Sequence, residues 1–252
     1  MTVAGWTVEG DRDTVLAPAK LTLSLRITGV RADGYHLIEA EMVTLDLADR
    51  LTIDPATTGL TADGPFSTGM PLDDKNLVAK ALKLTDRVAG IHIDKQIPHG
   101  GGLGGGSADA AAVLRWAGYT DVSSACRLGA DVGFCLVGGR AMVRGIGDLI
   151  EPLQPVNRNF TLVIPPLRCA TPLVYRAWDE LGGPRSEGGN DLEPAALVVE
   201  PRLAVWRERI HEATGIVPTL AGSGATWFVE GHHRALGESL AGSRVVLAAT
   251  AA

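Results

Sequence analysis

The pattern of apolar and polar positions along the chain predicts short strands first, and helices alternating with strands later. Residues 21–27 alternate apolar with polar side chains, which is the period of two of a half-buried strand. Residues 40–46 and 50–53 indicate further strands, with Ala48 and Asp49 as turn material between them. Successive alternating strands favour antiparallel pairing. We therefore expect a mostly antiparallel sheet in the N-terminal part.

Helical patterns begin after this strand region. Residues 77–89 form an amphipathic pattern behind Asn76, a candidate N-cap. Residues 108–116 are rich in Ala, Val and Leu and predict a second helix that stops near Gly118. Residues 119–125 contain few strong helix formers and predict a loop.

Prolines 152 and 155 and the polar residues after them mark the best candidate boundary in the chain. Beyond it, patterns predict helices over 172–181 and 201–214 and strands over 160–165, 218–220, 226–229 and 243–249. The order of elements predicts an α+β fold rather than a doubly wound parallel sheet. We expect two domains, residues 1–153 and 154–252.

Composition narrows the function classes. The 252 residues are 46% hydrophobic and 21% charged, which is typical of a globular protein and excludes disorder. A net charge of −6 provides no general basic surface, so long nucleic acids and membranes are unexpected partners. No apolar run is long enough to span a bilayer, and we expect a cytoplasmic protein. The three widely spaced cysteines predict reduced thiols rather than a metal site.

One glycine cluster is the strongest candidate for chemistry. Six of the seven residues 100–106 are glycine, and they lie between the alternating segment 91–95 and the helix predicted over 108–116. Glycines at a helix start let the main chain approach an anion closely, so the cluster predicts a phosphate-binding loop; the alternative is a flexible hinge. A Walker loop does not fit, because no lysine follows the last glycine. A dinucleotide fingerprint fits weakly, because the preceding strand is half polar.

Three motifs in order along the chain resemble one superfamily. Residues 98–111 (PHGGGLGGGSADAA) are similar to the central motif of the galactokinase, homoserine kinase, mevalonate kinase and phosphomevalonate kinase (GHMP) superfamily. Residues 17–23 (APAKLTL) resemble its N-terminal strand, and residues 220–226 (LAGSGAT) its C-terminal glycine loop. Residues 31–36 (RADGYH) and 128–132 (LGADV) most resemble the 4-diphosphocytidyl-2-C-methyl-D-erythritol kinases of the non-mevalonate isoprenoid pathway.

The resemblance implies a two-lobed GHMP kinase fold with a mostly antiparallel N-terminal sheet and a smaller α/β C-terminal lobe. It implies transfer of the γ-phosphoryl group of ATP, with Mg²⁺, to the 2-hydroxyl of a cytidine-diphosphate alcohol. Asn76 and Lys95 match positions near the adenine, and Ser107 a position near the phosphates and Mg²⁺. The other implied ATP-binding positions are Pro98, Gly100, Gly101, Gly102, Leu103, Gly104, Gly105 and Gly106.

The resemblance also assigns catalytic and substrate residues. Asp131 matches the aspartate that orients or deprotonates the acceptor hydroxyl, and Lys20 the lysine beside it; such a pair suits phosphoryl transfer, which depends on positioning and charge stabilisation. Tyr35 and His36 match residues that stack on and hydrogen-bond the cytosine. The remaining substrate positions are Tyr175, a second aromatic, Thr171, and Thr22, which stands where the family usually has Asn.

Without the resemblance, plainer interpretations of the same residues stay open. Asp131 could be a turn or cap carboxylate, and Lys20 and Lys95 solvated charges on strands. Asn76 and Ser107 could be helix caps, and Tyr175 a core residue. At the level of function, the alternatives are a sibling kinase acting on mevalonate, homoserine or a sugar, and a nucleotide-binding protein without turnover. We expect a monomer or a weak homodimer.

Overall fold

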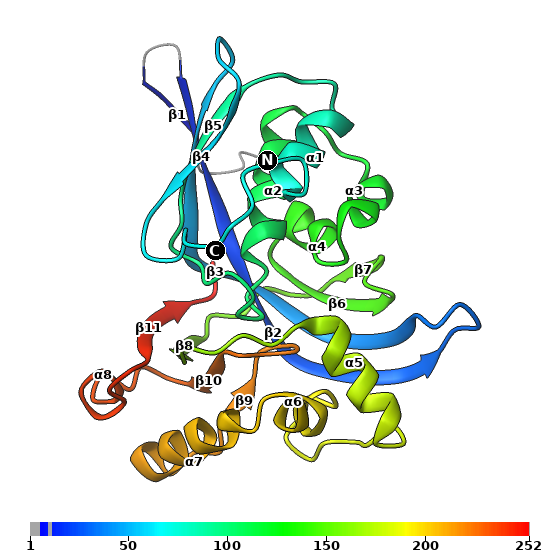
Figure 1. The fold of residues 1–252 in the computed structure, drawn as a ribbon, viewed down its shortest axis with the longest axis vertical. Coiled ribbons are helices and arrows are strands. Elements are labelled where there is room, and N and C mark those ends of the chain that lie inside the picture. Colours follow the sequence, from blue (N-terminus) through cyan, green and yellow to red (C-terminus); the bar gives the residue numbers. More distant parts are fainter. Residues whose placement is uncertain (1–5, 10–11, 252) are drawn as a thin grey trace. The chain divides into compact units, whose positions relative to one another are not determined.

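The computed structural model describes residues 6–9 and 12–251 (Figure 1). Its strands are β1 (Trp6–Glu9), β2 (Arg12–Val30), β3 (His36–Asp54), β4 (Gly59–Asp63), β5 (Gly90–Asp94), β6 (Arg140–Gly145), β7 (Leu149–Pro152), β8 (Asn159–Ile164), β9 (Thr219–Leu220), β10 (Trp227–Glu230) and β11 (Arg244–Ala249). Its helices are α1 (Leu77–Leu84), α2 (Gly105–Trp116), α3 (Val122–Leu128), α4 (Val132–Val137), α5 (Thr171–Glu180), α6 (Glu193–Val199), α7 (Arg202–Thr214) and α8 (Leu236–Ser239).

The larger sheet has the strand order β1-β2-β3-β5-β4, and β6 pairs with both β3 and β7. β3 runs antiparallel to β5 and to β6, whereas β4 and β5 are parallel. The smaller sheet has the order β11-β8-β10-β9, and its pairs are antiparallel. The predicted α+β class and mostly antiparallel N-terminal sheet are therefore confirmed.

The turn predicted at Ala48 and Asp49 is wrong, because β3 passes through both residues without a break. Asp49 is fully buried, and its Oδ1 accepts hydrogen bonds from the main-chain N–H groups of Gln96 (2.6 Å) and Ile97 (2.8 Å). A carboxylate that is satisfied in this way can occupy an inward-facing strand position. In an alternating strand pattern, a polar residue at an inward-facing position indicates the end of the strand, and the pattern therefore predicted a turn at Asp49.

The helices of residues 105–137 form one apolar layer. In α2, every residue from Ala108 to Leu114 is buried, which agrees with the helix predicted there from its Ala-rich sequence. The loop predicted over 119–125 is only partly correct, because α3 begins at Val122. Asp121 caps α3 by accepting a hydrogen bond from the N–H of Ser124 (3.1 Å). This local cap outweighs the weak helix propensity of the segment.

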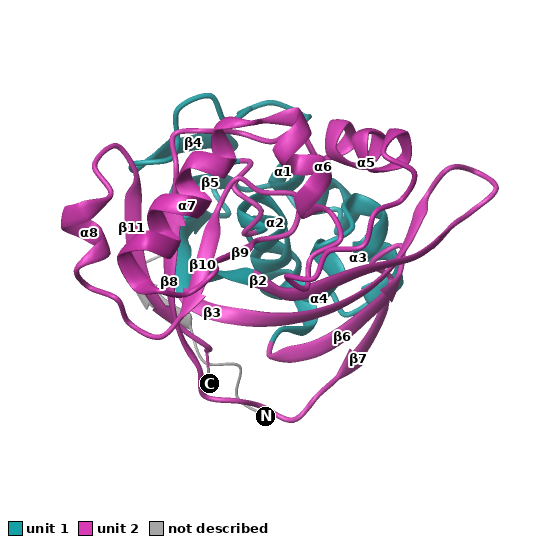
Figure 2. Ribbon diagram, turned by 90° about the horizontal axis from the view of Figure 1, so that it is seen from below, with its two compact units in different colours: residues 1–20, 47–99, 104–138 teal, residues 21–46, 100–103, 139–252 magenta. Residues whose placement is uncertain are grey.

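The chain forms two compact units that interleave in sequence (Figure 2). Unit 1 comprises residues 1–20, 47–99 and 104–138, and unit 2 comprises residues 21–46, 100–103 and 139–252. The strands β2 and β3 each contribute residues to both units. The single boundary that the sequence predicted, after residue 153, remains a prediction beside this interleaved arrangement.

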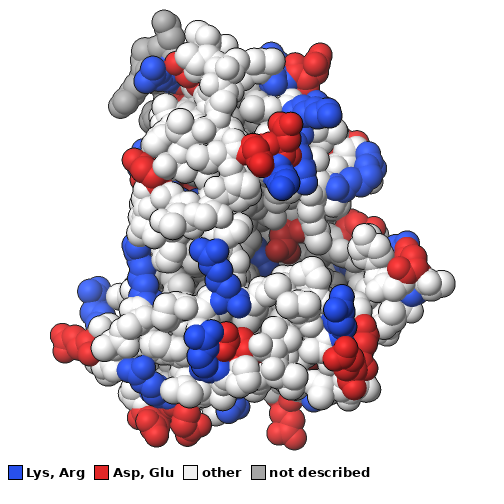
Figure 3. All heavy atoms as spheres, viewed as in Figure 1, with Lys and Arg blue, Asp and Glu red and all other residues white. Residues whose placement is uncertain are grey.

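The charged side chains on one face of the protein carry both signs. On the face shown in Figure 3, Lys and Arg are interspersed with Asp and Glu, and neither sign forms a continuous field. Among the described residues, every helix is too short or too polar to cross a membrane.

Candidate active site

The structure brings Lys20 and Asp131 together within unit 1. The Nζ of Lys20, in β2, lies 3.3 Å from Oδ2 of Asp131, and the lysine side chain is almost fully buried. Asp131 directly precedes α4, but its side chain makes no capping hydrogen bond there. The cap and solvated-charge interpretations of this pair are therefore wrong. The carboxylate keeps 32% of its surface exposed, so it remains open to a reactant.

The start of α2 lies beside this pair. The helix begins at Gly105, and its N-cap is Gly104, whose φ is 68° and which has no side chain to cap the first N–H groups. These groups and the positive end of the helix dipole form an anion-binding arrangement. A Cβ at Gly104 would lie 2.7 Å from Cγ of Lys20, so only glycine lets Lys20 pack against the helix start. Ser107 is the third residue of α2, and its interpretation as a cap is wrong.

In unit 2, Gly101 and Gly102 contact the C-terminal glycine loop, residues 220–226. The N–H of Thr226 donates to the carbonyl oxygen of Gly101 (3.3 Å). Gly102 has a φ of 80°, and a Cβ on it would lie 2.0 Å from the carbonyl oxygen of Ala221. Two of the segments that resemble GHMP motifs are therefore in direct contact.

Gly102→Ala should destabilise the protein by about 2–4 kcal/mol, because the new methyl group overlaps Ala221 and because alanine rarely adopts a φ of 80°. Gly106→Ala is the matched control: it lies inside α2, and the nearest atom to an added Cβ is 3.9 Å away. Alanine there should be neutral or stabilise by up to about 1 kcal/mol. Urea denaturation of both variants measures the difference, and equal midpoints would contradict the contact.

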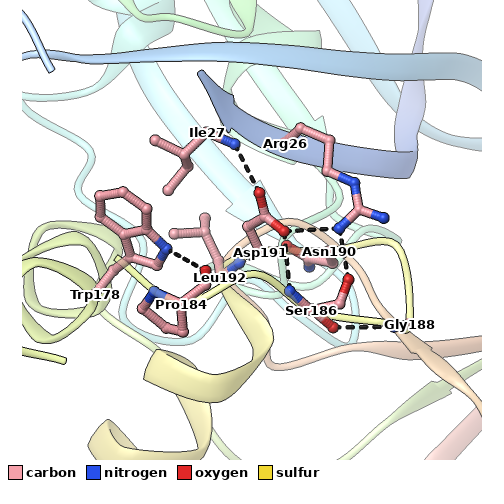
Figure 4. Close-up of polar contacts among 9 residues, drawn as sticks. All are labelled: Arg26, Ile27, Trp178, Pro184, Ser186, Gly188, Asn190, Asp191 and Leu192. Carbon is pink, nitrogen blue, oxygen red and sulfur yellow. Dashed lines mark hydrogen bonds and ion pairs between the residues drawn. The ribbon is translucent and has the colours of Figure 1, made fainter. Parts of the chain in front are cut away.

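Two buried polar residues, Asn190 and Asp191, connect the C-terminal glycine loop and β2; Figure 4 shows the contacts of Asp191. The Nδ2 of Asn190 donates to the carbonyl oxygens of Leu220 (2.8 Å) and Gly222 (2.7 Å). Its neighbour Asp191 accepts from Arg26 Nη1 (2.7 Å) and from the N–H of Ile27 (3.0 Å), both in β2. Neither residue is predicted from the sequence as part of the site. Their only local signal, an Asn-Asp pair between a glycine turn and a helix, is also typical of an ordinary turn.

Of the three ring-bearing residues predicted to bind the base, only two pack together. His36 and Tyr175 pack with ring centroids 4.7 Å apart, and Trp178, which the sequence analysis missed, packs edge-on against His36 at 5.5 Å. Tyr35 is 60% exposed and contacts Arg31 instead. Thr171 begins α5 and shares a 2.8 Å hydrogen bond with Ser223 of the C-terminal glycine loop, whereas Thr22 is buried in β2.

The chain is similar in sequence to known proteins. The sequence model described as GHMP kinases N terminal domain matches residues 76–148. The 4-diphosphocytidyl-2-C-methyl-D-erythritol kinase of Paracoccus denitrificans (strain Pd 1222) is 38% identical over 233 residues, which cover 84% of each chain. That of Pelotomaculum thermopropionicum (strain DSM 13744 / JCM 10971 / SI) is 34% identical, over 85% of this chain and 88% of its own. The chain belongs to the 4-diphosphocytidyl-2-C-methyl-D-erythritol kinase family.

Solved structures agree with this membership. A crystal structure of a 4-(cytidine 5'-diphospho)-2C-methyl-D-erythritol kinase superposes with a TM-score of 0.77 at 33% identity and covers 95% of this chain and 100% of its own. The mevalonate kinase of Methanococcus jannaschii, at 14% identity and a TM-score of 0.60, shares the fold. The protein is thus an ATP-dependent small-molecule kinase with the GHMP fold.

In this family member, two predicted adenine-side residues have other partners. Asn76 caps α1: its Oδ1 accepts from the N–H of Val78 (2.9 Å), and its Nδ2 donates to the carbonyl oxygen of Pro71 (2.7 Å). The interpretation of Asn76 as an N-cap is confirmed. Lys95 is only 1% exposed, so its interpretation as a solvated charge is wrong. Its Nζ forms ion pairs with Asp49 and, at 2.6 Å, with Asp109 of α2.

The buried cluster Asp49–Lys95–Asp109 brings two carboxylates to one ammonium. Burial raises the pKa of Asp109 to about 8; the Asp49 carboxylate adds to the rise, and Lys95 opposes it. Oδ1 of Asp109 is buried without a hydrogen-bond partner. A retained proton on Asp109 would make the cluster neutral, which the apolar surroundings favour. The cluster fastens α2, whose first turn lies at the glycine loop, to the segment after β5.

The unfolding free energy should therefore fall as pH rises from about 4 to about 8. Asp109 has a raised pKa in the folded protein, so in this range the folded state binds more protons than the unfolded chain does. Asp109→Asn removes this proton linkage, and its stability should depend less on pH across the same window. Chemical denaturation at several pH values measures the slope. The exposed Asp74→Asn should keep the wild-type slope, and an unchanged slope in Asp109→Asn would contradict the assignment.

Proposed function

We propose that the protein transfers the γ-phosphoryl group of ATP to the 2-hydroxyl of 4-diphosphocytidyl-2-C-methyl-D-erythritol. The observation that carries the proposal is the Lys20–Asp131 pair at the uncapped start of α2, in a chain whose relatives are named for this reaction. A cytoplasmic location is part of the proposal, because the reaction draws on the cytoplasmic ATP pool.

In the proposed reaction, each group of the pair has a role. The hydroxyl oxygen of the acceptor attacks the γ-phosphorus, the bond to the bridging oxygen of ADP breaks, and the hydroxyl proton leaves toward the Asp131 carboxylate. Lys20 holds that carboxylate at 3.3 Å and places a positive charge beside the helix start where the phosphates would bind. Positioning and charge stabilisation of this kind account for most of the catalysis in phosphoryl transfer.

The nucleotide would be held mainly by main-chain atoms. The loop from Pro98 to Ser107 supplies N–H groups for the phosphates, and the C-terminal glycine loop supports it at Gly101 and Gly102. The side chains of Asn76 and Lys95 already have protein partners. Their main-chain N–H groups are also bonded, to the carbonyl oxygens of Asp73 and Asp63. Their proposed contribution to the adenine site is therefore through the shape of the surrounding segment.

The proposed Mg²⁺ would be held differently from a structural metal. Among the described residues, no group of three or more His, Cys, Asp and Glu side chains could form a metal cage. Proteins commonly bind Mg²⁺ through one or two side chains together with substrate phosphates. Ser107, on the first turn of α2, is the proposed protein ligand. The ion would neutralise charge on the β- and γ-phosphates.

A phosphoryl-transfer assay tests the proposal. Purified protein, ATP and Mg²⁺ are incubated separately with 4-diphosphocytidyl-2-C-methyl-D-erythritol, mevalonate and homoserine, and ADP and the phosphorylated product are both measured. Turnover with the cytidine-containing alcohol alone is expected. Turnover only with mevalonate or homoserine would assign the protein to a sibling activity, and ATP binding without any product would favour a nucleotide-binding protein without turnover.

A further inference from the structure

One face of α5 holds the imidazole of His36 on three sides. Tyr175, Trp178 and Asp179 have the spacing i, i+3, i+4 and therefore project from the same side of the helix. Oδ1 of Asp179 lies 2.8 Å from Nε2 of His36, while Tyr175 and Trp178 pack against its ring. His36 begins β3, so this contact joins α5 to the larger sheet within unit 2.

The ring of His36 is fixed rather than free to rotate. Its side chain is only 10% exposed, whereas that of Asp179 is 49% exposed. Trp178 is itself anchored, because its Nε1 donates to the carbonyl oxygen of Pro184 (2.9 Å). A ring held by two aromatic side chains and one hydrogen bond presents a constant edge to any ligand that reaches it.

The partner of Nε2 determines what the other ring nitrogen can do. A carboxylate only accepts hydrogen bonds, so Nε2 carries the hydrogen that bonds to Asp179. In the neutral imidazole, Nδ1 then has a lone pair and is an acceptor. Within the described residues, no hydrogen bond is made to Nδ1. A ligand group that meets Nδ1 must therefore donate.

This requirement separates the two pyrimidines. Cytosine has an amino group at position 4, which donates, whereas uracil has a carbonyl oxygen there, which accepts. Cytosine would form a hydrogen bond with Nδ1, and uracil would place two lone pairs against each other. Discrimination that combines an attractive contact with one base and a repulsive contact with the other is a general route to specificity.

The geometry points to Asp179 as a specificity-determining positioning residue: by fixing the hydrogen of His36 on Nε2, it makes the kinase select cytosine over uracil. The inference rests on the proposed function, because it takes His36 as the residue that meets the base. Asp179 itself does not touch the substrate. It acts through the imidazole, as a carboxylate acts on the histidine of other enzyme sites.

Binding of CMP and UMP, measured by isothermal titration calorimetry, tests the inference without depending on turnover. The wild type should prefer CMP by about tenfold, as one hydrogen bond gained or lost predicts. Asp179→Ala should lose most of this preference. Asp179→Asn should lie between the two, because its amide can accept from Nε2 or donate to it. Glu180→Gln is the matched control: it removes the same charge from the same turn of α5, and it should keep the wild-type preference because Asp179, not Glu180, bonds to His36.

The outcomes separate this inference from the proposed function. If the wild type binds neither nucleotide, the proposed substrate and the inference both fail. If the wild type and both Asp179 variants prefer CMP equally, the inference fails and the proposed function stands. Nitrogen-15 NMR of histidine-labelled wild-type protein gives a second measurement that needs no variant. An unprotonated Nδ1 and a protonated Nε2 in His36 are expected, and the opposite tautomer would overturn the inference.

Discussion

Replacing Asp131 with Asn should reduce kcat by about 10²–10⁴-fold, which is the usual contribution of a positioned acid or base. The amide has nearly the same shape as the carboxylate, but it cannot take the proton of the acceptor hydroxyl and has no charge to pair with Lys20. ATP should still bind, because the start of α2 is unchanged. Single-turnover kinetics measures the chemical step, and a titration with ATP measures the affinity.

A matched control makes the Asp131 result specific. Asp74→Asn removes an exposed carboxylate from the same unit, and kcat should remain at the wild-type value. A near-normal kcat for Asp131→Asn would remove this residue from the mechanism. A loss of kcat accompanied by an equal loss of ATP affinity would indicate a damaged fold rather than a missing catalytic group.

Lys95→Met should lower the free energy of unfolding by about 3–5 kcal/mol, because it leaves Asp49 and Asp109 buried without a positive partner. The loss should grow as pH rises, since the two carboxylates can then no longer share a proton. Urea denaturation at two pH values measures both effects. Lys83→Met removes an exposed charge from α1 and should change stability by no more than about 0.5 kcal/mol. Equal losses in the two variants would show that the buried cluster is not stabilised by Lys95.

The sequence predicted elements well where one local pattern controls them. The strands near residues 160–165 and 243–249 and the helices near 172–181 and 201–214 match β8, β11, α5 and α7 closely. The helix predicted over 77–89 ends early, at Leu84, where Thr85 closes α1 by bonding to the carbonyl oxygens of Ala81 and Leu82. Patterns of this kind depend on residues that lie only a few positions apart, so they can be recognised in the sequence alone.

The site residues required information that no local pattern contains. The pairing of Lys20 with Asp131 was suggested only by the family resemblance, because the two residues are 111 positions (131 − 20) apart. The Asp49–Lys95–Asp109 cluster was missed because burial of a charge depends on its partners, which lie on three separate segments. Asp179 was missed although it follows Tyr175 at i+4, because the sequence does not show that His36 lies against this helix face.

The last strand of the chain, β11, completes unit 2 late in translation. β11 pairs with β8, and two late residues bond to β3: the N–H of Ala249 donates to Oδ1 of Asp46 (2.8 Å), and that of Ala251 to the carbonyl oxygen of Thr44 (2.9 Å). Residues 44–46 leave the ribosome long before these partners are synthesised. The nascent chain can gather every segment of unit 1 once residue 138 has emerged, whereas unit 2 must wait for residues 244–251. Until then the hairpin of β2 and β3 lacks these last bonds.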